Sequence, residues 1–152
     1  MPRLSRSHQE AWSALFVTQA RIQLEVDRAL EEAGLPPHTW YDLLYRLHLA
    51  DGKRMRMHEL ADEVAMSRSG LTRLADRLEE AGLVTRRQCP TDRRGLELEL
   101  LPAGTEMLRR IWAVYGEVLA RTFGAHVGDP GAITEQLRPV LEAVGARAVG
   151  RA

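Results

Sequence analysis

The chain of 152 residues is poor in several features that mark whole classes of protein. Its one cysteine, Cys89, cannot form an internal disulfide, so a reducing cytoplasm is the expected location. No stretch approaches the roughly 18 consecutive apolar residues of a membrane-spanning helix, and the first ten residues lack the apolar core of a signal peptide. We therefore expect a folded globular domain, or one subunit of an oligomer, with no membrane partner.

Net charge is also absent, because 21 basic residues balance 21 acidic ones. A nucleic-acid-binding domain usually carries a basic excess, so the total argues against one. The distribution changes this interpretation. Residues 53–94 hold 10 basic and 7 acidic side chains, whereas residues 1–52 and 95–152 are both mildly acidic. A net charge of +3 also suits an ordinary solvated surface, so the segment has to be judged by its motifs.

Hydrophobic residues recur at three- and four-residue steps along most of the chain, which predicts helices. The expected helices cover residues 8–33, 38–50, 57–65, 68–81 and 102–123, with a last one starting near Asp129-Pro130. Gly34 and Gly82 stand where helix C-termini favour glycine. Leu101 is a poor N-cap for the fifth helix, and Pro139 is expected to kink the last one.

A β-hairpin is predicted between the fourth and fifth helices. The segment LELELL at 96–101 alternates strictly, and the turn-forming PTDRRG at 90–95 separates it from LVTRRQC. Two short helices joined tightly and followed by a basic hairpin form a winged helix-turn-helix. The predicted fold class is mainly α with a small β-hairpin wing, an α+β winged helix-turn-helix flanked by long helices.

The fourth helix has the two faces that a DNA-recognition helix needs. Its leucines point to a core, and polar side chains surround the rest, with an arginine suited to a bidentate contact with guanine. The hairpin tip carries two arginines suited to a minor groove and an aspartate that would orient one of them. The candidate DNA-binding residues are Ser67, Arg68, Ser69, Thr72, Arg73, Arg77, Asp92, Arg93 and Arg94. A solvated amphipathic helix is the alternative interpretation.

The sequence closely resembles the MarR family of bacterial transcriptional regulators. The resemblance is carried by HELAD (58–62), Ser67, SGLTRLADRLEEAGLVTRR (69–87), TDRRG (91–95) and LELELL before PAG (102–104). It departs from the family pattern at Leu101, where a threonine cap is usual.

The resemblance implies a homodimer that reads a pseudo-palindromic duplex DNA operator. Repression is favoured over activation, because a dimer that covers a promoter blocks polymerase by occlusion, and no cofactor is expected. The implied organisation is an N-terminal dimerisation helix (1–36), a winged helix-turn-helix domain (37–101) and C-terminal dimerisation helices (102–152). Asp92 and Arg94 map to the wing Asp-x-Arg pair, with Arg94 in the minor groove.

The resemblance also suggests a small phenolic or aromatic-acid effector, since many family members are released from DNA by one. Aromatic walls with a tyrosine hydroxyl and an imidazole suit a flat ring bearing an acid group. The candidate lining residues are Trp12, Phe16, Trp40, Tyr41, Tyr45 and His48. The alternative is that these side chains form interface core.

Three other interpretations compete. His58 and Asp62 sit one helical turn apart, as in zinc motifs, but no further ligand cluster exists, so neither a metal site nor an enzyme is expected. Cys89 lies near Arg86 and Arg87, yet a small strand residue is favoured over a redox sensor. The main rival function is a winged-helix module that binds protein without specific DNA binding.

Overall fold

The computed structural model describes residues 3–89 and 92–145, with backbone only for 92–94. Helices dominate, and three short strands form one sheet. The elements in chain order are α1 (Arg6–Glu32), α2 (His38–Leu49), the 3₁₀ turn η1 (Asp51–Lys53), β1 (Arg54–Arg56), α3 (Met57–Glu63), α4 (Arg68–Glu80), β2 (Val84–Cys89), β3 (Asp92–Leu100), α5 (Pro102–Leu119), the π-helical turn η2 (Ala120–Gly124) and α6 (Pro130–Ala143).

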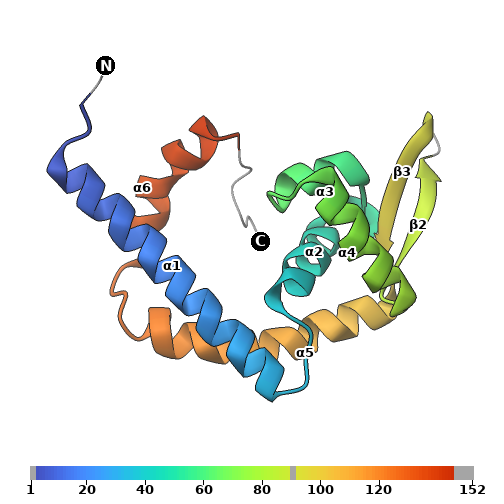
Figure 1. The fold of residues 1–152 in the computed structure, drawn as a ribbon, viewed down its shortest axis with the longest axis horizontal. Helices are drawn as coiled ribbons and strands as arrows, with labels where there is room; N and C mark the ends of the chain where they lie inside the picture. The colour runs from blue at the N-terminus through green and yellow to red at the C-terminus, as the bar shows by residue number, and fades with distance from the viewer. Residues whose placement is uncertain (1–2, 90–91, 146–152) are drawn as a thin grey trace.

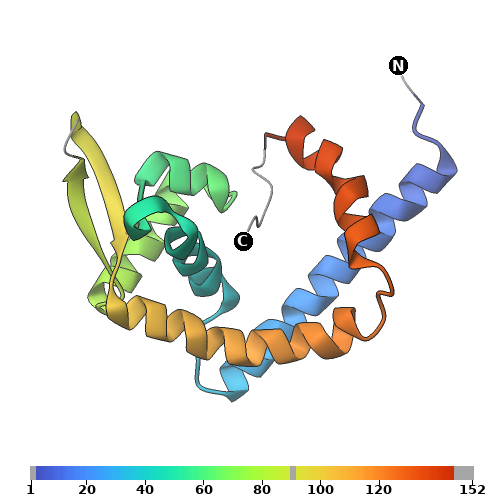
Figure 2. The ribbon, with the colours of Figure 1, turned by 180° about the vertical axis from the view of Figure 1, so that it is seen from behind.

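The molecule has two arms joined by α5 (Figures 1 and 2). One arm is the winged domain, in which α2, α3 and α4 gather beside the β2–β3 hairpin. The other arm consists of α6 and the N-terminal half of α1. The C-terminal half of α1 crosses α5 at the base, where Val26 and Leu30 pack with Ile111 and Val118.

The sheet has the order β1-β3-β2 and is antiparallel throughout. In β3, Leu98 faces Met55 of β1 on one side and Arg86 of β2 on the other. Leu98 and Leu100 are buried, while Leu96 is 47% exposed. The alternating LELELL segment is therefore a half-buried strand as predicted, but the strand β1 was not foreseen.

The winged domain has its own core, built from the leucine stripes of its helices and the inner face of the sheet. Its buried members are Leu43, Leu44, Leu47, Leu60, Ala61, Leu71, Leu74, Ala75, Leu78, Leu83, Val84, Leu98, Leu100 and Leu108. Because Leu108 belongs to α5, this core attaches the winged domain to the helix that connects the two arms.

The helix ends follow the sequence signals. Gly82 has φ +69°, and the N–H groups of Gly82 and Leu83 bond to the carbonyls of Glu79 and Leu78, which is a Schellman motif. Asp129 caps α6 by accepting from the N–H of Ala132 at 3.0 Å. Leu101 makes no side-chain cap for α5, as expected. These local rules fix where each element stops.

The N-terminus of α2 is capped from another helix. Pro37 provides no side-chain cap, and Asp27 of α1 accepts a hydrogen bond from the N–H of His38 at 3.0 Å. The Nδ1 of the His38 ring lies 2.8 Å from the same carboxylate. This contact ties α1 to the start of the winged domain.

Candidate nucleic-acid interface

The turn between α3 and α4 is short and closed by backbone hydrogen bonds. Ala65 adopts φ +52°, and the N–H of Met66 donates to the carbonyl of Ala61 at 2.9 Å. The hydroxyl of Ser67 then caps α4 by accepting from the N–H of Gly70 at 3.1 Å. These contacts set α4 across α3, which is the arrangement of a helix-turn-helix.

Helix α4 separates its apolar and polar side chains cleanly. Leu71, Leu74, Ala75 and Leu78 are buried. The predicted contact residues lie on the opposite side or at the N-terminus and are exposed: Ser67, Arg68, Ser69, Thr72, Arg73 and Arg77. The structure therefore brings these six residues together on one exposed surface.

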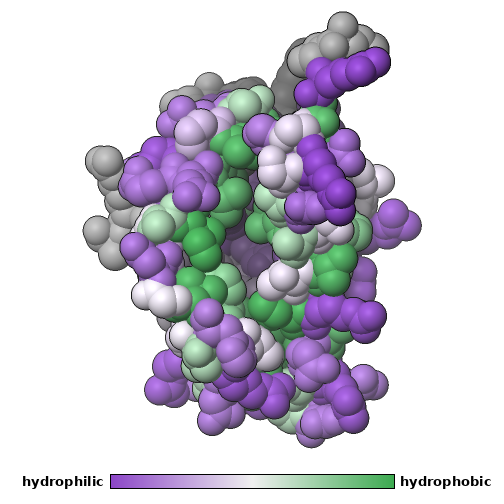
Figure 3. Space-filling model, turned by 90° about the vertical axis from the view of Figure 1, so that its left-hand side faces the viewer, coloured by the Kyte–Doolittle hydropathy of each residue, from purple (hydrophilic) through white to green (hydrophobic). Residues whose placement is uncertain are grey.

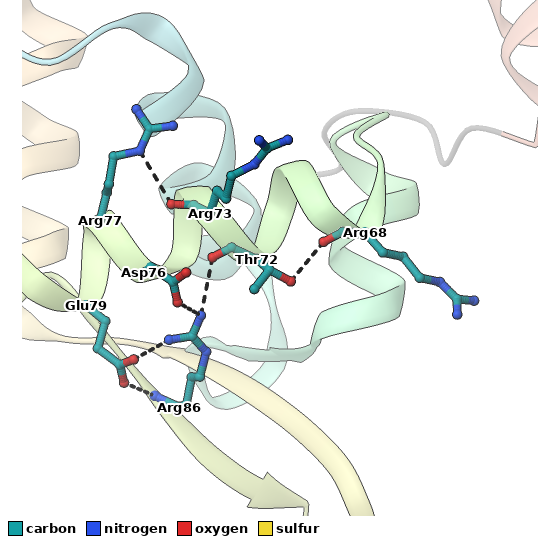
Figure 4. Close-up of polar contacts among 7 residues, drawn as sticks. All are labelled: Arg68, Thr72, Arg73, Asp76, Arg77, Glu79 and Arg86. Carbon is teal, nitrogen blue, oxygen red and sulfur yellow. Dashed lines mark hydrogen bonds and ion pairs between the residues drawn. The ribbon is translucent and has the colours of Figure 1, made fainter.

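The three arginines of this surface are available for a ligand. Among the described residues, none of the ion pairs engages Arg68, Arg73 or Arg77. Within the helix, Arg77 Nε donates only to the carbonyl of Arg73, at 3.4 Å. Figure 4 shows all three guanidinium groups extending away from the helix.

A fourth arginine, Arg86 of β2, lies against the recognition helix instead. Its guanidinium contacts Asp76 Oδ1 and Glu79 Oε2, each at 2.5 Å, and its backbone N–H donates to Glu79 Oε1 at 2.8 Å (Figure 4). The backbone hydrogen bond from Arg86 is the largest of the interactions that lower the pKa of Glu79 below its ordinary value. The sequence analysis did not include Arg86 among the candidate DNA-binding residues, although Arg86 lies between two arginine-rich segments of the chain.

The predicted wing residues are described less fully. Asp92, Arg93 and Arg94 belong to β3, but their side chains lie outside the described part of the structure, as do residues 90 and 91 altogether. The roles assigned to Asp92, Arg93 and Arg94 stay predictions.

A groove of about 340 Å³ separates the recognition helix from the base of the wing. Its lining residues include Met57 and His58 of α3, Arg68 and Thr72 of α4, Arg86 of β2 and Leu96 of β3. Four elements contribute, so no single stretch of sequence revealed it. A basic and hydroxyl-bearing wall beside α4 fits a phosphate backbone.

A second groove, of about 460 Å³, lies between α2 and α5. Of the predicted effector residues, the structure places Tyr41, Tyr45 and His48 in its wall. Thr105, Glu106, Leu108, Arg109 and Trp112 of α5 complete the lining. The α5 residues were not predicted, because they lie far from α2 in the sequence and meet it only in the folded protein.

The remaining predicted effector residues lie elsewhere. Trp12 and Phe16 are 63% and 62% exposed on the N-terminal half of α1 and do not line this groove. Trp40 packs against both hydrophobic cores. The structure thus divides the predicted aromatic set between a groove, a core and an exposed surface.

The aromatic wall of this groove is preorganised. The ring of Tyr41 stacks on Tyr45 at 5.4 Å and on Trp112 at 5.7 Å, and meets Tyr115 edge-on at 5.0 Å. Burial, followed by the neighbouring Tyr45 and Tyr115, raises the pKa of Tyr41 well above its ordinary value. A tyrosine hydroxyl can donate a hydrogen bond to a ligand.

The metal site and the redox-sensing cysteine considered above have little support in the described residues. No group of three or more His, Cys, Asp or Glu side chains within residues 3–89 and 92–145 is placed to hold a metal ion. Cys89 is 4% exposed, and Arg56 Nη2 donates to its Sγ at 3.4 Å. None of the described helices has the length and apolarity to cross a membrane.

The fold and this surface define the chain as a winged helix-turn-helix protein. The sequence model of the MarR family matches residues 33–95. AbsC from Streptomyces coelicolor, a MarR family transcriptional regulator, is 30% identical, with a TM-score of 0.80 over 95% of this chain and 99% of AbsC. The chain belongs to the MarR family.

Two further relatives are similar. Sco3205 from S. coelicolor, a MarR family regulator solved in complex with DNA, is 29% identical, with a TM-score of 0.78 over 95% of this chain and 90% of its own. The transcriptional repressor MprA from Escherichia coli (strain K12) is 31% identical over 93 residues. That match covers 61% of this chain and 52% of MprA, so the chain spans about half the length of this curated relative.

Proposed function

We propose that this protein is a transcriptional regulator that binds duplex DNA through α4 and the wing. The carrying observation is the exposed face of α4, where Arg68, Arg73 and Arg77 have no carboxylate partner among the described residues. The 29% identity with Sco3205, a relative solved with DNA, supports the same conclusion. Because these arginines have no carboxylate partner among the described residues, no ion pair has to break when they bind a ligand of opposite charge.

In the proposed complex α4 enters the major groove. Arg73 reads a guanine edge, for which a bidentate contact supplies about 1–3 kcal/mol of discrimination. Ser67, Arg68 and the N-terminal N–H groups of α4 meet phosphates, which position the helix without reading bases. Arg94, oriented by Asp92, enters the minor groove.

The selection of binding duplexes from random DNA tests this proposal. We expect one preferred sequence with two related half-sites, and an affinity that falls steeply as salt rises. Arg73→Ala should relax base preference, and Arg94→Ala should weaken binding across sequences. Arg28→Ala, a matched arginine on α1, should change neither.

A null result identifies the rival function. If the selection enriches no duplex, and Arg73→Ala and Arg94→Ala leave affinity for duplex DNA unchanged, Arg73 and Arg94 do not read DNA. A winged-helix module that binds protein is then the better description. Repression follows from occlusion of a promoter by the bound protein, and a reporter placed behind the selected sequence should be silenced in cells that express the protein.

We propose further that two copies assemble through α1 and α6. None of the 14 residues of α6 is buried within the protomer. Figure 3 shows this arm from its outer side, where apolar side chains line both walls of a hollow. The exposed large apolar residues of α1 are Trp12, Leu15, Phe16, Val17 and Leu24, and those of α6 and its C-cap are Ile133, Val140 and Val144. Exposed apolar residues gathered on one surface mark an interaction site.

The mass in solution tests the assembly. We expect the parent chain to be a dimer by sedimentation, and the double variant Trp12→Ser/Phe16→Ser to dissociate at micromolar concentration. Leu49→Ser is the control, because Leu49 is 52% exposed but lies on α2. A parent chain that is monomeric, or a control variant that dissociates equally, contradicts the proposed interface.

The groove between α2 and α5 is the proposed effector site. An aromatic acid would stack on the wall formed by Tyr41 and Trp112, and its carboxylate would contact His48 and Arg109. In the structure, Arg109 forms an ion pair with Glu106 at 2.9 Å. Because α5 joins both arms, a ligand wedged there would change the angle between the winged domain and the dimer.

A panel of aromatic acids and their uncharged amides tests the effector site. We expect an acid such as salicylate to raise the unfolding temperature and to weaken operator binding, and the amide to do neither. Arg109→Met should abolish the response, whereas Arg110→Met, the adjacent exposed arginine, should keep it. No response to any acid contradicts this part of the proposal without affecting DNA binding.

A further inference from the structure

Arg86 makes more polar contacts to the recognition helix than any residue outside it that the structure describes. The guanidinium contacts Asp76 and Glu79, and it also reaches the carbonyl of Thr72 at 3.3 Å. The backbone N–H of Arg86 contacts Glu79 as well. This one residue of β2 therefore forms hydrogen bonds with three successive turns of α4.

The guanidinium is also shielded. The side chain of Arg86 is 22% exposed, compared with 59% for Asp76 and 35% for Glu79. Its contacts spread over both terminal nitrogens, in the forked geometry that only arginine provides. This arrangement points inward to the helix and leaves the outer face of α4 to other side chains (Figure 4).

The charges of α4 show what this contact prevents. The helix holds three arginines, Arg68, Arg73 and Arg77, and three carboxylates, Asp76, Glu79 and Glu80, so its own net charge is zero. Asp76 follows Arg73 by three positions, a spacing at which oppositely charged side chains on a helix meet. Asp76 is therefore placed within pairing distance of Arg73 along the helix, and its contact with Arg86 keeps its carboxylate occupied.

We propose that Arg86 is a positioning residue for DNA recognition: it occupies the carboxylates of Asp76 and Glu79, which leaves Arg73 unpaired and holds α4 at a fixed angle to the wing. This inference rests on the proposed function. Arg86 acts through Arg73 and through the orientation of α4.

The test measures Kd by fluorescence anisotropy for the full-length protein and the duplex that the parent protein selects. Six proteins are compared: the parent, Asp76→Asn, Glu80→Gln, Arg86→Met, Arg86→Met/Asp76→Asn and Arg86→Met/Glu80→Gln. Glu80 is the matched control, because it is an exposed carboxylate of the same helix and the same charge is removed.

Arg86→Met should weaken binding by about tenfold, because Asp76 then captures Arg73. Adding Asp76→Asn to Arg86→Met should restore affinity by about fivefold, although the same change in the parent alters it by less than about twofold. Glu80→Gln should change affinity by less than about twofold in both backgrounds, because Glu80 does not compete for Arg73.

A second measurement separates positioning from mere stability. In the selection from random DNA, Arg86→Met should lose the same base preference that Arg73→Ala loses. The double variant Arg86→Met/Asp76→Asn should regain it. A purely structural loss would lower the unfolding midpoint in urea without this recovery. If Arg86→Met does not fold, Arg86→Lys replaces it. Lysine keeps the charge but loses the fork, and Asp76→Asn should again restore more affinity than Glu80→Gln.

Equal rescue by Asp76→Asn and Glu80→Gln overturns the inference, since Arg86 would then contribute only general charge. Unchanged affinity in Arg86→Met overturns it too. In both cases the parent still binds DNA, so the proposed function survives. A parent protein that binds no duplex overturns the proposed function, and the inference with it.

Discussion

Gly104 occupies the place where α5 meets the base of the wing, and replacing it with alanine gives a sharp test of the packing. The residue is buried in the first turn of α5. A Cβ atom there would lie 2.2 Å from the carbonyl oxygen of Leu83 and 2.6 Å from Leu100 Cδ1. The Leu83 carbonyl also accepts the N–H of Leu101 at 3.0 Å, so it cannot yield without weakening that bond.

The magnitude follows from two opposing effects. To bring the Cβ to about 3.0 Å from the oxygen, α5 and the Leu83 turn must separate by about 0.8 Å. Overpacking of this kind costs about 1–3 kcal/mol. Alanine recovers up to about 1 kcal/mol because it is the better helix former. We expect Gly104→Ala to destabilise the protein by about 1–2 kcal/mol, which is about 2–8 °C in unfolding temperature for a chain of this size.

Gly116→Ala is the matched control, because Gly116 lies in the same helix and its added Cβ would meet only the Trp112 ring at 3.4 Å, an ordinary contact. There the helix propensity should dominate and raise the unfolding temperature by about 2–4 °C. Calorimetry at one protein concentration measures both variants, since an assembling protein melts at a temperature that depends on concentration. Gly104→Ala melting at or above the parent would refute the packing described here.

Three further predictions concern single side chains. Ser67→Ala removes the cap on the N–H of Gly70 and should destabilise the protein by about 1 kcal/mol in urea unfolding, whereas Ser67→Asp should not. Leu101→Asp supplies the missing cap of α5 and should stabilise by about 0.5–1 kcal/mol in the same assay; no gain would contradict the cap assignment. The depressed pKa of Glu79 predicts stability that is fully present above the pKa of an unfolded glutamate and is lost as pH falls through the lower folded value. Titrating stability in acid should therefore show a smaller decline for Glu79→Gln, and an identical decline would count against the contact with Arg86.

The helical elements followed directly from the sequence, because their signals are local. Residues 8–33 were predicted as the first helix, and the structure has Arg6–Glu32. The recognition helix was predicted over 68–81 and spans Arg68–Glu80. Periodicity and caps act within one or two turns, so they can be recognised without knowing the tertiary structure.

The fifth helix and the strand β1 show the limits of local signals. The predicted helix over 102–123 ends at Leu119 and continues as the π-helical turn Ala120–Gly124. The strand β1, which is only three residues long, was not predicted at all. A three-residue strand owes its existence to the pairing of Arg54–Arg56 with β3, which is a contact across more than forty residues.

The exposed face of α4 follows from its own sequence, because the buried leucine stripe leaves Ser69, Thr72, Arg73 and Arg77 on the other side of the helix. Which arginines form ion pairs depends on the tertiary structure. Arg73 and Arg86 are both arginines in a basic segment, yet folding places Arg86 against Asp76 and Glu79 and leaves Arg73 exposed. Which charges pair depends on the angle at which β2 packs against α4, and no local pattern encodes that angle.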